Sequence, residues 1–382
     1  MRTAVERDFE EIASQTLPWG DLCGKRILCT GATGFIGRYF ASFLCWLNRR
    51  LGLGMDLWLL RRPETPETIP GATWITGQIT DEFIPLGQHF HIIIHMASPA
   101  RARAYSADPA GVVNANILAT RFLLEYAKLN QSVFLFFSSG EVNPDQNSFI
   151  PEALPSLLAG AASGLTIYSA CKLAGELLCE AYHNSYGTDC RIIRPFNVRG
   201  PGEPLDSDRT FPNFIREIVH TGEITVRGNG LPVRDSCYLS DLVSGVLYVL
   251  LKGQGAGYSL VHHIGNEESA CTILEAARKM AKIYGHGTVN GPLSKSGTAG
   301  RDFFVPDTTR LRSLGWRPRV DLDECIRRCL EGYSQEKSKK DPCGGGGGGI
   351  IAVFQENCDT CCVTLRMGEM ILTNAGACCF IY

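Results

Sequence analysis

The sequence predicts an α/β fold in which a doubly wound parallel sheet carries a smaller C-terminal lobe. Short apolar runs alternate with longer amphipathic segments through the first half of the chain, as in βαβ units whose helices cover both faces of a parallel sheet. The first apolar run is followed by glycines at three-residue spacing, Gly31, Gly34 and Gly37. Strand, glycine-rich turn and helix in this order are typical of a dinucleotide-binding fold of the Rossmann type.

The first half of the chain predicts six strands with helices between them. The expected strands are residues 27–29, 57–60, 73–77, 91–95, 133–137 and 190–194. The expected helices are residues 38–49, 114–129 and 166–186, the second of which has an apolar stripe at helical spacing. Gly31 permits the tight turn after the first strand, Gly34 lets the backbone approach a pyrophosphate, and Gly37 lets the helix pack closely. The N-terminus of that helix then attracts phosphate groups.

Beyond Pro195 the alternation is looser. The expected helices are residues 211–220, 241–251, 272–283 and 322–333, and short strands are expected at 224–226 and 259–264. We therefore divide the chain into four regions. They are a helical lead-in at 1–24, a dinucleotide-binding Rossmann domain at 25–195, a smaller substrate-binding lobe of the same fold at 196–333, and a tail at 334–382.

The tail differs in composition from the rest of the chain. An unbroken glycine run at 344–349 is typical of a flexible linker, so we expect the tail to be disordered. Five cysteines follow, including Cys358, Cys361 and Cys362. The segment has no histidine and no second well-spaced cysteine pair, so no metal site is expected.

Composition and charge are those of a globular protein with a large core. The chain has 382 residues, of which 45% are hydrophobic and 20% are charged, and its formal net charge is −2. This charge gives no support for binding to nucleic acid or to a membrane surface. No apolar run approaches the roughly 20 residues that span a bilayer, and the charged N-terminus lacks the apolar stretch of a secretion signal.

The cysteines favour a reducing location. Five of the sixteen, Cys29, Cys45, Cys171, Cys179 and Cys190, fall inside expected strands and helices, where reduced cysteine packs as a small hydrophobic side chain. Disulfides are rare in reducing compartments, so this distribution predicts a protein of the cytoplasm.

A tyrosine and a lysine four residues apart are the first candidates for chemistry. Tyr168 and Lys172 share one face of the helix that follows the fifth strand. A nearby ammonium group favours the phenolate, so the pKa of Tyr168 is expected to fall toward a value useful to a general base. Such pairs also arise by chance on helices. The functional interpretation is favoured because Ser138 and Ser139 end a strand that points at the same crevice.

Several further motifs occur in one order along the chain. They are Thr-Gly-Ala-Thr-Gly-Phe-Ile-Gly at 30–37, His-Met-Ala-Ser-Pro at 95–99, Asn116 to Thr120, Ser-Ser-Gly-Glu-Val at 138–142, the Tyr168 and Lys172 pair, Arg-Pro-Phe-Asn-Val-Arg-Gly-Pro-Gly at 194–202, Arg-Asp-Ser-Cys-Tyr-Leu-Ser-Asp at 234–241 and Gly315-Trp316. Over about residues 20–333 the sequence thereby resembles the extended short-chain dehydrogenases/reductases, the NAD-dependent epimerase/dehydratase family of nucleotide-sugar enzymes. Ala97-Ser98-Pro99 and residues 209–213 make it most similar to UDP-glucuronate decarboxylases and dTDP-glucose 4,6-dehydratase-like members.

The resemblance implies roles for individual residues. Tyr168 would be the base, Lys172 would tune it and bind the nicotinamide ribose, Ser139 would be the hydroxyl partner, and Glu141 would complete the catalytic set. The implied cofactor-binding residues are Gly31, Thr33, Gly34, Phe35, Ile36, Gly37, Arg61, Gln78, Ile79, Ala97, Ser98, Tyr168, Lys172 and Pro195. The implied substrate-binding residues are Asn197 together with Arg209, Arg234 and Arg301, which would neutralise the diphosphate. Taken singly, each arginine reads as an ordinary surface charge.

The cofactor implied is NAD, with NADP as an alternative. Relatives that bind NAD usually place an acidic residue at the end of the second strand, to bond the ribose 2′-hydroxyl. This chain has Arg61 there, with Arg62 beside it, and an arginine can accept a 2′-phosphate or stack on adenine. The resemblance further implies a homodimer that pairs through helices 114–129 and 166–186.

The implied reaction begins with oxidation of the sugar at C4 and ends with return of the hydride. A 4,6-dehydratase of this kind carries an adjacent Asp and Glu after the hydroxyl residue, but here Ser139 is followed by Gly140 and Glu141, so the acid is missing. Decarboxylases usually carry serine at position 140, and a 4-epimerase needs neither acidic group. We expect decarboxylation of UDP-glucuronate to UDP-xylose, with 4-epimerisation and 4,6-dehydration of dTDP-glucose as alternatives.

Alternatives to this chemistry also fit the fold. A non-catalytic nucleotide-binding protein of the same fold is disfavoured because Ser139, Tyr168 and Lys172 are all present. The second alternative is a reductase that consumes external NAD(P)H. The chain also departs from the family pattern, with Asn143-Pro144 in place of Tyr-Gly, Arg199 in place of a common tyrosine, and Gln78-Ile79 in place of an acidic-apolar pair.

Overall fold

The computed structural model describes residues 4–65, 69–79, 87–100, 107–143, 167–206, 209–253, 260–294, 302–340, 351–356 and 359–364, with side chains as far as residue 333. The chain divides into two compact units, Met1–Gly332 and Tyr333–Tyr382. Among the described residues, no helix combines the length and the apolar character that a membrane crossing requires.

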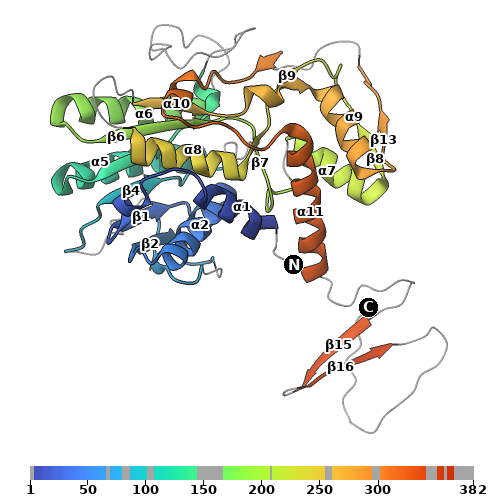
Figure 1. Ribbon diagram of the computed structural model, residues 1–382, viewed down its shortest axis with the longest axis horizontal. Helices are drawn as coiled ribbons and strands as arrows, with labels where there is room; N and C mark the ends of the chain where they lie inside the picture. Colours follow the sequence, from blue (N-terminus) through green and yellow to red (C-terminus); the bar gives the residue numbers. More distant parts are fainter. Residues whose placement is uncertain are drawn as a thin grey trace. The chain divides into compact units, whose positions relative to one another are not determined.

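A seven-stranded parallel sheet organises the first unit (Figure 1). Its strands are β1 (Arg26–Thr30), β2 (Asp56–Arg61), β3 (Thr73–Thr76), β4 (Ile92–His95), β5 (Val133–Phe137), β6 (Cys190–Pro195) and β11 (Val261–Ile264). They lie in the order β11-β6-β5-β4-β1-β2-β3, and every neighbouring pair is parallel. The order reverses between β1 and β4, which makes this the point where such sheets bind ligands. The predicted doubly wound sheet is confirmed.

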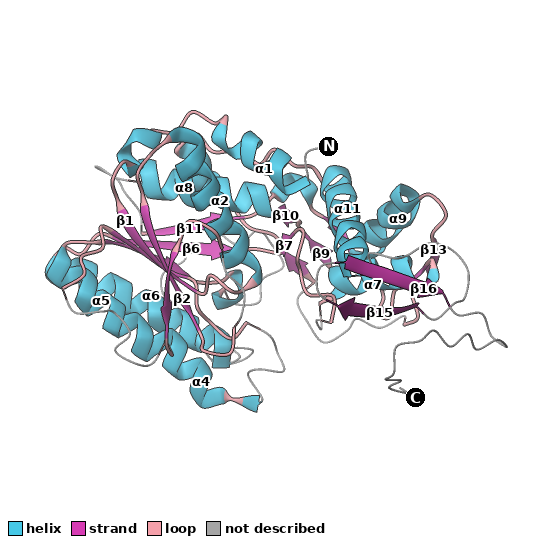
Figure 2. Cartoon of the chain, turned by 90° about the horizontal axis from the view of Figure 1, so that it is seen from below, coloured by secondary structure: helices cyan, strands magenta, loops and turns pink. Residues whose placement is uncertain are grey.

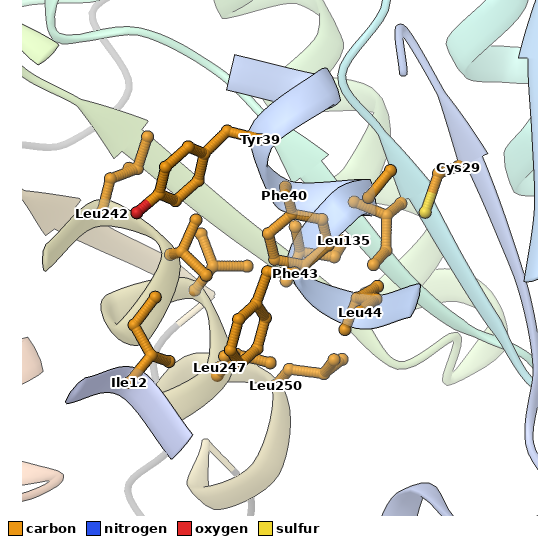
Figure 3. Close-up of a cluster of buried hydrophobic side chains, with 14 of the residues drawn as sticks. Ile12, Cys29, Tyr39, Phe40, Phe43, Leu44, Leu135, Leu242, Leu247 and Leu250 are labelled. Atoms are coloured by element: carbon orange, nitrogen blue, oxygen red, sulfur yellow. The ribbon is translucent and has the colours of Figure 1, made fainter. Parts of the chain in front are cut away.

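Helices cover both faces of the sheet (Figure 2). One face carries α1 (Ala4–Ala13), α2 (Phe35–Leu51) and α8 (Leu239–Lys252), and the other carries α4 (Pro109–Val113), α5 (Ala119–Asn130) and α6 (Ile167–Tyr186). Figure 3 shows the core on the first face, where aromatic and leucine side chains of α2 pack against leucines of α8. The five cysteines expected inside strands and helices are all buried, Cys29 and Cys45 in this core and Cys179 and Cys190 in the core of the other face.

The helix expected at 114–129 is longer than predicted. It begins at Pro109, passes through a π-helical turn (Asn114–Leu118), and continues as α5 to Asn130. The Asp108 carboxylate accepts a hydrogen bond from the Gly111 N–H at 2.8 Å and so caps the helix start. Asp followed by Pro is a signal for the start of a helix, but a prediction from apolar periodicity alone does not detect it.

The N-terminal segment is integrated into the core. Phe9 of α1 packs edge-on against Tyr39 and Phe43 of α2, with ring centroids 5.2 and 5.5 Å apart. The buried Asp8 carboxylate accepts hydrogen bonds from the hydroxyls of Tyr39 and Tyr238 at 2.8 and 2.9 Å. It also pairs with Arg328 at 2.6 Å. Burial raises the pKa of Asp8 to about 6 in spite of these partners. A short 3₁₀ helix (Trp19–Leu22) then leads into β1.

The second half of the first unit builds a smaller lobe from short elements. Its helices are α7 (Thr210–Thr221), α9 (Ile273–Tyr284) and α11 (Leu322–Lys340), the last of which runs past the end of the unit at Gly332. The short helix α10 (Thr309–Ser313) packs instead on β11 and α8, and 3₁₀ turns lie at Gly140–Val142 and Glu267–Ser269. The strands of the lobe are β7 (Val198–Arg199), β8 (Glu223–Thr225), β9 (Val233–Arg234), β10 (Cys237–Tyr238), β12 (Cys271–Thr272), β13 (Thr288–Asn290) and β14 (Phe303–Phe304). They pair as β10-β7, β12-β9-β14 and β13-β8.

The second unit contains two strands that no sequence pattern predicted. Strands β15 (Ile351–Glu356) and β16 (Asp359–Thr364) pair antiparallel. Cys361 and Cys362 lie on β16, and Cys358 lies outside the described residues. Both strands are rich in β-branched residues, which favour extended backbone.

Candidate active site

The turn after β1 has the shape that its glycines predict. Gly31 has φ +74°, and a Cβ on it would lie 2.6 Å from the backbone nitrogen of Ala97 at the end of β4. A Cβ on Gly37 would lie 2.1 Å from the carbonyl oxygen of Gly31. Side chains are therefore excluded at both positions. Gly34 is the N-cap of α2, and its own exposed position leaves room for a ligand to approach the backbone.

The helix that starts here offers its N-terminus to an anion. Thr33, Phe35 and Ile36 lie at this start and are half-buried. The first N–H groups of a helix have no intrahelical acceptor and carry the positive end of its dipole. The predicted pyrophosphate-binding residues therefore share one helix N-terminus at the switch point of the sheet.

A buried histidine fixes the adjoining strand end. The Thr30 hydroxyl lies 2.8 Å from Nδ1 of His95 and accepts a hydrogen bond from the Ala97 N–H at 3.2 Å. The other ring nitrogen of His95 lies 3.2 Å from the carbonyl oxygen of Ala115. Burial, aided by the positive charge of Lys172, lowers the pKa of His95 to about 3, so the ring is neutral.

Ser98 provides a test of whether a dinucleotide fits. Its hydroxyl oxygen is buried and has no hydrogen-bond partner in the described part of the chain. Buried hydroxyls are normally paired, so an unpaired one marks a place for a polar ligand group. Together with the exposed backbone of Gly34 at the N-terminus of α2, this unpaired hydroxyl makes the residues present suited to a bound NAD.

The predicted adenine side lies at the ends of β2 and β3. Arg61 donates to the Thr76 hydroxyl and to the Thr65 carbonyl, each at 3.1 Å. Its guanidinium carbon lies 6.0 Å from the centroid of the Trp74 ring. The guanidinium group of Arg61 is thus already hydrogen-bonded within the protein. Gln78 is exposed, and Ile79 packs against the apolar core beneath this side of the sheet.

The structure brings the predicted serine, tyrosine and lysine together. The hydroxyls of Ser139 and Tyr168 are hydrogen-bonded. The Lys172 ammonium group donates to the carbonyl oxygen of Phe137, the last residue of β5, at 2.6 Å. It lies 5.9 Å from the centroid of the Tyr168 ring. Tyr168 and Lys172 are both buried.

The expected fall in the pKa of Tyr168 is not present in the protein alone. Burial raises the pKa of Tyr168, while the hydrogen bond from Ser139 and the charge of Arg209 oppose that rise. Burial also lowers the pKa of Lys172 to about 7, against the pull of the Glu176 carboxylate. The sequence argument considered the lysine charge and left out desolvation, which acts on both groups.

The residues after Ser139 form a 3₁₀ turn that carries Glu141 outward. Glu141 is exposed, and its negative charge raises the pKa of Tyr168, so the carboxylate lies within electrostatic reach of the phenol. The intervening Gly140 has no room for a side chain. A Cβ there would lie 2.7–2.8 Å from three ring carbons of Phe196, which is fully buried.

Two of the predicted substrate residues converge on one phenylalanine. Asn197 has φ +37°, and its amide donates to Asp235 at 2.6 Å and to the carbonyl oxygen of Phe304 at 3.3 Å. Arg234 donates to the Val233 carbonyl at 2.8 Å, and its guanidinium carbon lies 6.0 Å from the Phe304 ring centroid. Pro195, half-buried, ends the neighbouring strand β6.

Arg209 begins α7 on the tyrosine side of the site. It is exposed, and its positive charge lowers the pKa of Tyr168 and of Glu203. Glu203 is itself buried against Arg199, at 3.0 Å. Arg199, which replaces a common tyrosine, therefore forms an ion pair beneath the site. Arg301 lies outside the described residues.

Sequence reasoning missed a buried polar network below the reacting side chains. Glu176, one turn after Lys172 on α6, pairs with Arg194 of β6 and accepts a hydrogen bond from Ser138. Arg194 donates to the side chain of Asn143 at 3.1 Å. A sequence pattern that points to Glu176 was present, because Tyr168, Lys172 and Glu176 are spaced four residues apart along one helix face. No group of three or more potential metal ligands lies within the residues that the structure describes.

Comparison with known proteins agrees with this geometry. Residues 27–265 match the NAD dependent epimerase/dehydratase family. UDP-glucuronic acid decarboxylase 1 of Xenopus tropicalis is 28% identical over 320 residues, which are 82% of this chain and 73% of that protein. UDP-glucuronic acid decarboxylase 6 of Arabidopsis thaliana is 28% identical over 313 residues, covering 78% of this chain and 86% of that protein.

Solved structures share the fold. A variant of UDP-glucuronic acid 4-epimerase from Bacillus cereus, in complex with a fluorinated UDP-glucuronic acid and NAD, superposes with a TM-score of 0.69 at 23% identity, covering 81% of this chain and 99% of the epimerase. Epimerase Mth375 of Methanothermobacter thermautotrophicus superposes with a TM-score of 0.70 at 20% identity, covering 89% and 98%. With more than half of its length matched, the chain belongs to the NAD-dependent epimerase/dehydratase family.

Proposed function

We propose that this chain binds NAD and decarboxylates UDP-glucuronate to UDP-xylose. The observation that carries the proposal is the hydrogen-bonded pair of Ser139 and Tyr168 beside Lys172, at the carboxyl end of β5, on the same edge of the sheet as the glycine turn and two strands away from it. The identity of the curated relatives, which are UDP-glucuronic acid decarboxylases, supports the choice of reaction.

Each residue of this group has a task in the first step. Bound NAD supplies a hydride acceptor for the hydrogen on C4 of the sugar and later returns it. Tyr168 takes the proton of the C4 hydroxyl, while Ser139, already bonded to the phenol, holds that hydroxyl in place. Lys172 and Arg209 place positive charge near the phenol and so favour its ionised form against the effect of burial.

Decarboxylation needs little more from the protein. A ketone at C4 lies beside C5, the carbon that carries the carboxylate of glucuronate, and it delocalises the electron pair left when carbon dioxide departs. Asn197, Arg209 and Arg234 are the proposed contacts of the nucleoside diphosphate, with Arg301 as a further expected contact. The half-buried Arg234 and exposed Arg209 present guanidinium groups suited to diphosphate oxygens.

The absence of a side chain at position 140 disfavours 4,6-dehydration. That reaction needs an acid to protonate the departing C6 hydroxyl, and the ring of Phe196 fills the place where a side chain on residue 140 would stand. The retained Glu141 has no evident task in a 4-epimerase. We therefore favour decarboxylation, which needs no separate acid to act on C6.

The test is incubation of the purified protein with UDP-glucuronate, UDP-glucose, UDP-galactose and dTDP-glucose, followed by mass analysis of the products. We expect loss of carbon dioxide from UDP-glucuronate and no net accumulation of NADH. An unchanged mass with inverted C4 would identify an epimerase, and loss of water from dTDP-glucose would identify a dehydratase. Stoichiometric consumption of NAD(P)H would identify a reductase, and no turnover of any sugar would favour a non-catalytic nucleotide-binding protein.

We further propose a homodimer that pairs through α5 and α6. Four large apolar side chains on or beside these helices are exposed, namely Leu118 at 54%, Leu129 at 76%, Ile167 at 36% and Tyr186 at 58%. A second copy of the chain would remove them from water. Sedimentation of the wild-type protein against a Leu118→Ser/Leu129→Ser variant tests this, and a monomeric wild type would contradict it.

A further inference from the structure

We propose that Glu176 is a positioning residue whose carboxylate joins helix α6 to the loop after β5 and places a negative charge one helical turn from Lys172. This inference rests on the proposed function, because it assigns Glu176 to the same reacting group. The residue does not touch the phenol of Tyr168 or the hydroxyl of Ser139 in any contact that the structure describes.

The carboxylate of Glu176 is shared between two elements that meet at the site. Both of its oxygens accept hydrogen bonds from Arg194 on β6, from Nε at 2.8 Å and from Nη2 at 2.5 Å. One of them also accepts a hydrogen bond from the hydroxyl of Ser138. Ser138 in turn donates its backbone N–H to Ile193, at 2.8 Å. Glu176 and Arg194 are each 5% exposed, so the pair lies in the protein interior.

The same ion pair reaches the loop that carries the catalytic serine. Arg194 donates to the side-chain oxygen of Asn143 at 3.1 Å, and the Asn143 amide donates to the carbonyl oxygen of Gly140 at 2.9 Å. The Ser139 hydroxyl accepts a hydrogen bond from the Glu141 N–H at 3.2 Å. The turn of residues 140–142 is therefore held on one side by Asn143 and on the other by Ser138, and both connect to Glu176.

The charge of Glu176 acts on Lys172 against the effect of burial. Facing Lys172 are Tyr168, Cys171, Cys179 and Glu176 on its own helix and the neutral His95 on β4. The ring of Phe136 on β5 lies 5.0 Å from the ammonium group, and Phe137 accepts its hydrogen bond. Among the groups that raise the pKa of Lys172, Glu176 is the strongest. Its loss would release the ammonium proton at lower pH.

The experiment compares Glu176→Gln with Glu180→Gln. Glutamine keeps the size of Glu176 and an acceptor for Ser138 but removes the charge, while Glu180 lies one turn further along the same helix and is exposed. We expect the alkaline limb of the pH profile of kcat/KM to move to lower pH by at least about one unit in Glu176→Gln. The profile of Glu180→Gln should match that of the wild type.

A second readout does not depend on turnover. Titration of ¹³C-labelled lysine side chains by NMR, with the Lys172 signal assigned from Lys172→Arg, measures the pKa directly in the protein without substrate. Glu176→Gln should lower this pKa by the same amount as it shifts the pH profile. If the wild type proves inactive on every nucleotide sugar, the proposed function fails while this titration still decides the role of Glu176.

Removing one member of a buried ion pair can also prevent folding, because the other charge is left uncompensated. The double variant Glu176→Leu/Arg194→Met removes both charges and restores an apolar interior. We expect it to fold with a Lys172 pKa below that of the wild type, by less than in Glu176→Gln, because the positive charge of Arg194 is removed together with the negative charge of Glu176. A wild-type pKa of Lys172 and a wild-type pH profile in whichever variant folds would overturn the proposal.

Discussion

Introduction of a side chain at position 140 tests how the site is built. A Cβ on Gly140 would approach three carbons of the Phe196 ring to 2.7–2.8 Å, closer than Cβ atoms come in proteins. The ring cannot move aside freely. It is fully buried, and its centroid lies 4.9 Å from the ring of Phe304 and 5.0 Å from that of His263. Gly140→Ser therefore forces either the ring or the turn out of place.

The magnitude follows from the overlap. Overpacking a well-filled interior costs about 1–3 kcal/mol. One kcal/mol shifts the melting temperature of a domain of 150–250 residues by about 2–4 °C, so we expect Tm to fall by roughly 2–12 °C. Because the displaced turn carries Ser139, kcat should fall with it. Thermal unfolding and initial rates on UDP-glucuronate measure the two effects.

Two further variants make the test specific. Gly20→Ser adds the same side chain where nothing lies within 4 Å, so its Tm should stay at the wild-type value. The double variant Gly140→Ser/Phe196→Leu removes the opposing ring atoms, and the two substitutions should be less destabilising together than the sum of their separate effects. Wild-type stability and activity in Gly140→Ser would refute the packing argument, and additive effects in the double variant would refute the role of Phe196.

Four further predictions follow from other parts of the molecule. Tyr168→Phe should lose about 10²–10⁴-fold in kcat at an unchanged Tm, since only the ionisable hydroxyl is removed; near-wild-type rates would exclude Tyr168 as the base. NAD should bind more tightly than NADP, because Arg61 already bonds Thr76 and Thr65; calorimetry with both dinucleotides decides this, and a preference for NADP would contradict it. Asp8→Asn should destabilise the protein by about 1–3 kcal/mol, because the buried carboxylate that Tyr39, Tyr238 and Arg328 share is lost while Arg328 keeps its pairs with Glu11 and Glu324, whereas Asp21→Asn, at an exposed position, should not. Deletion of residues 341–382 should leave Tm and activity unchanged, because a glycine run transmits no fixed geometry; a fall of several degrees would show that the tail packs on the core.

Local sequence patterns predicted the sheet well because each strand and each helix has its own hydrophobic periodicity. The glycine turn and the strand ends were located by Gly31, Gly37 and Ser139, whose positions follow from βα connectivity alone. The Tyr168 and Lys172 pair was predictable for the same reason, since four-residue spacing on a helix fixes a shared face.

Long-range pairing accounts for what sequence reasoning missed. Nothing in the sequence near Arg194 shows that its partner is Glu176, and nothing near Gly140 shows that Phe196 fills the space beside it. The pKa of Tyr168 was predicted in the wrong direction because desolvation depends on every element that covers the phenol. The spacing of residues along a helix determines which of them share a face, but only tertiary packing determines how strongly that face is desolvated.

The helix α1 acquires its full set of side-chain partners only when almost the whole chain has been made. Asp8 pairs with Arg328 across 320 residues and with Tyr238 across 230. During synthesis Phe9 can therefore meet Tyr39 and Phe43 of α2 early, while Asp8 lacks Tyr238 and Arg328 until nearly the whole chain has been made. Contacts so distant along the chain form late and slowly. A nascent chain that stops short of residue 328 therefore leaves the Asp8 carboxylate without the ion pair that it has in the finished protein.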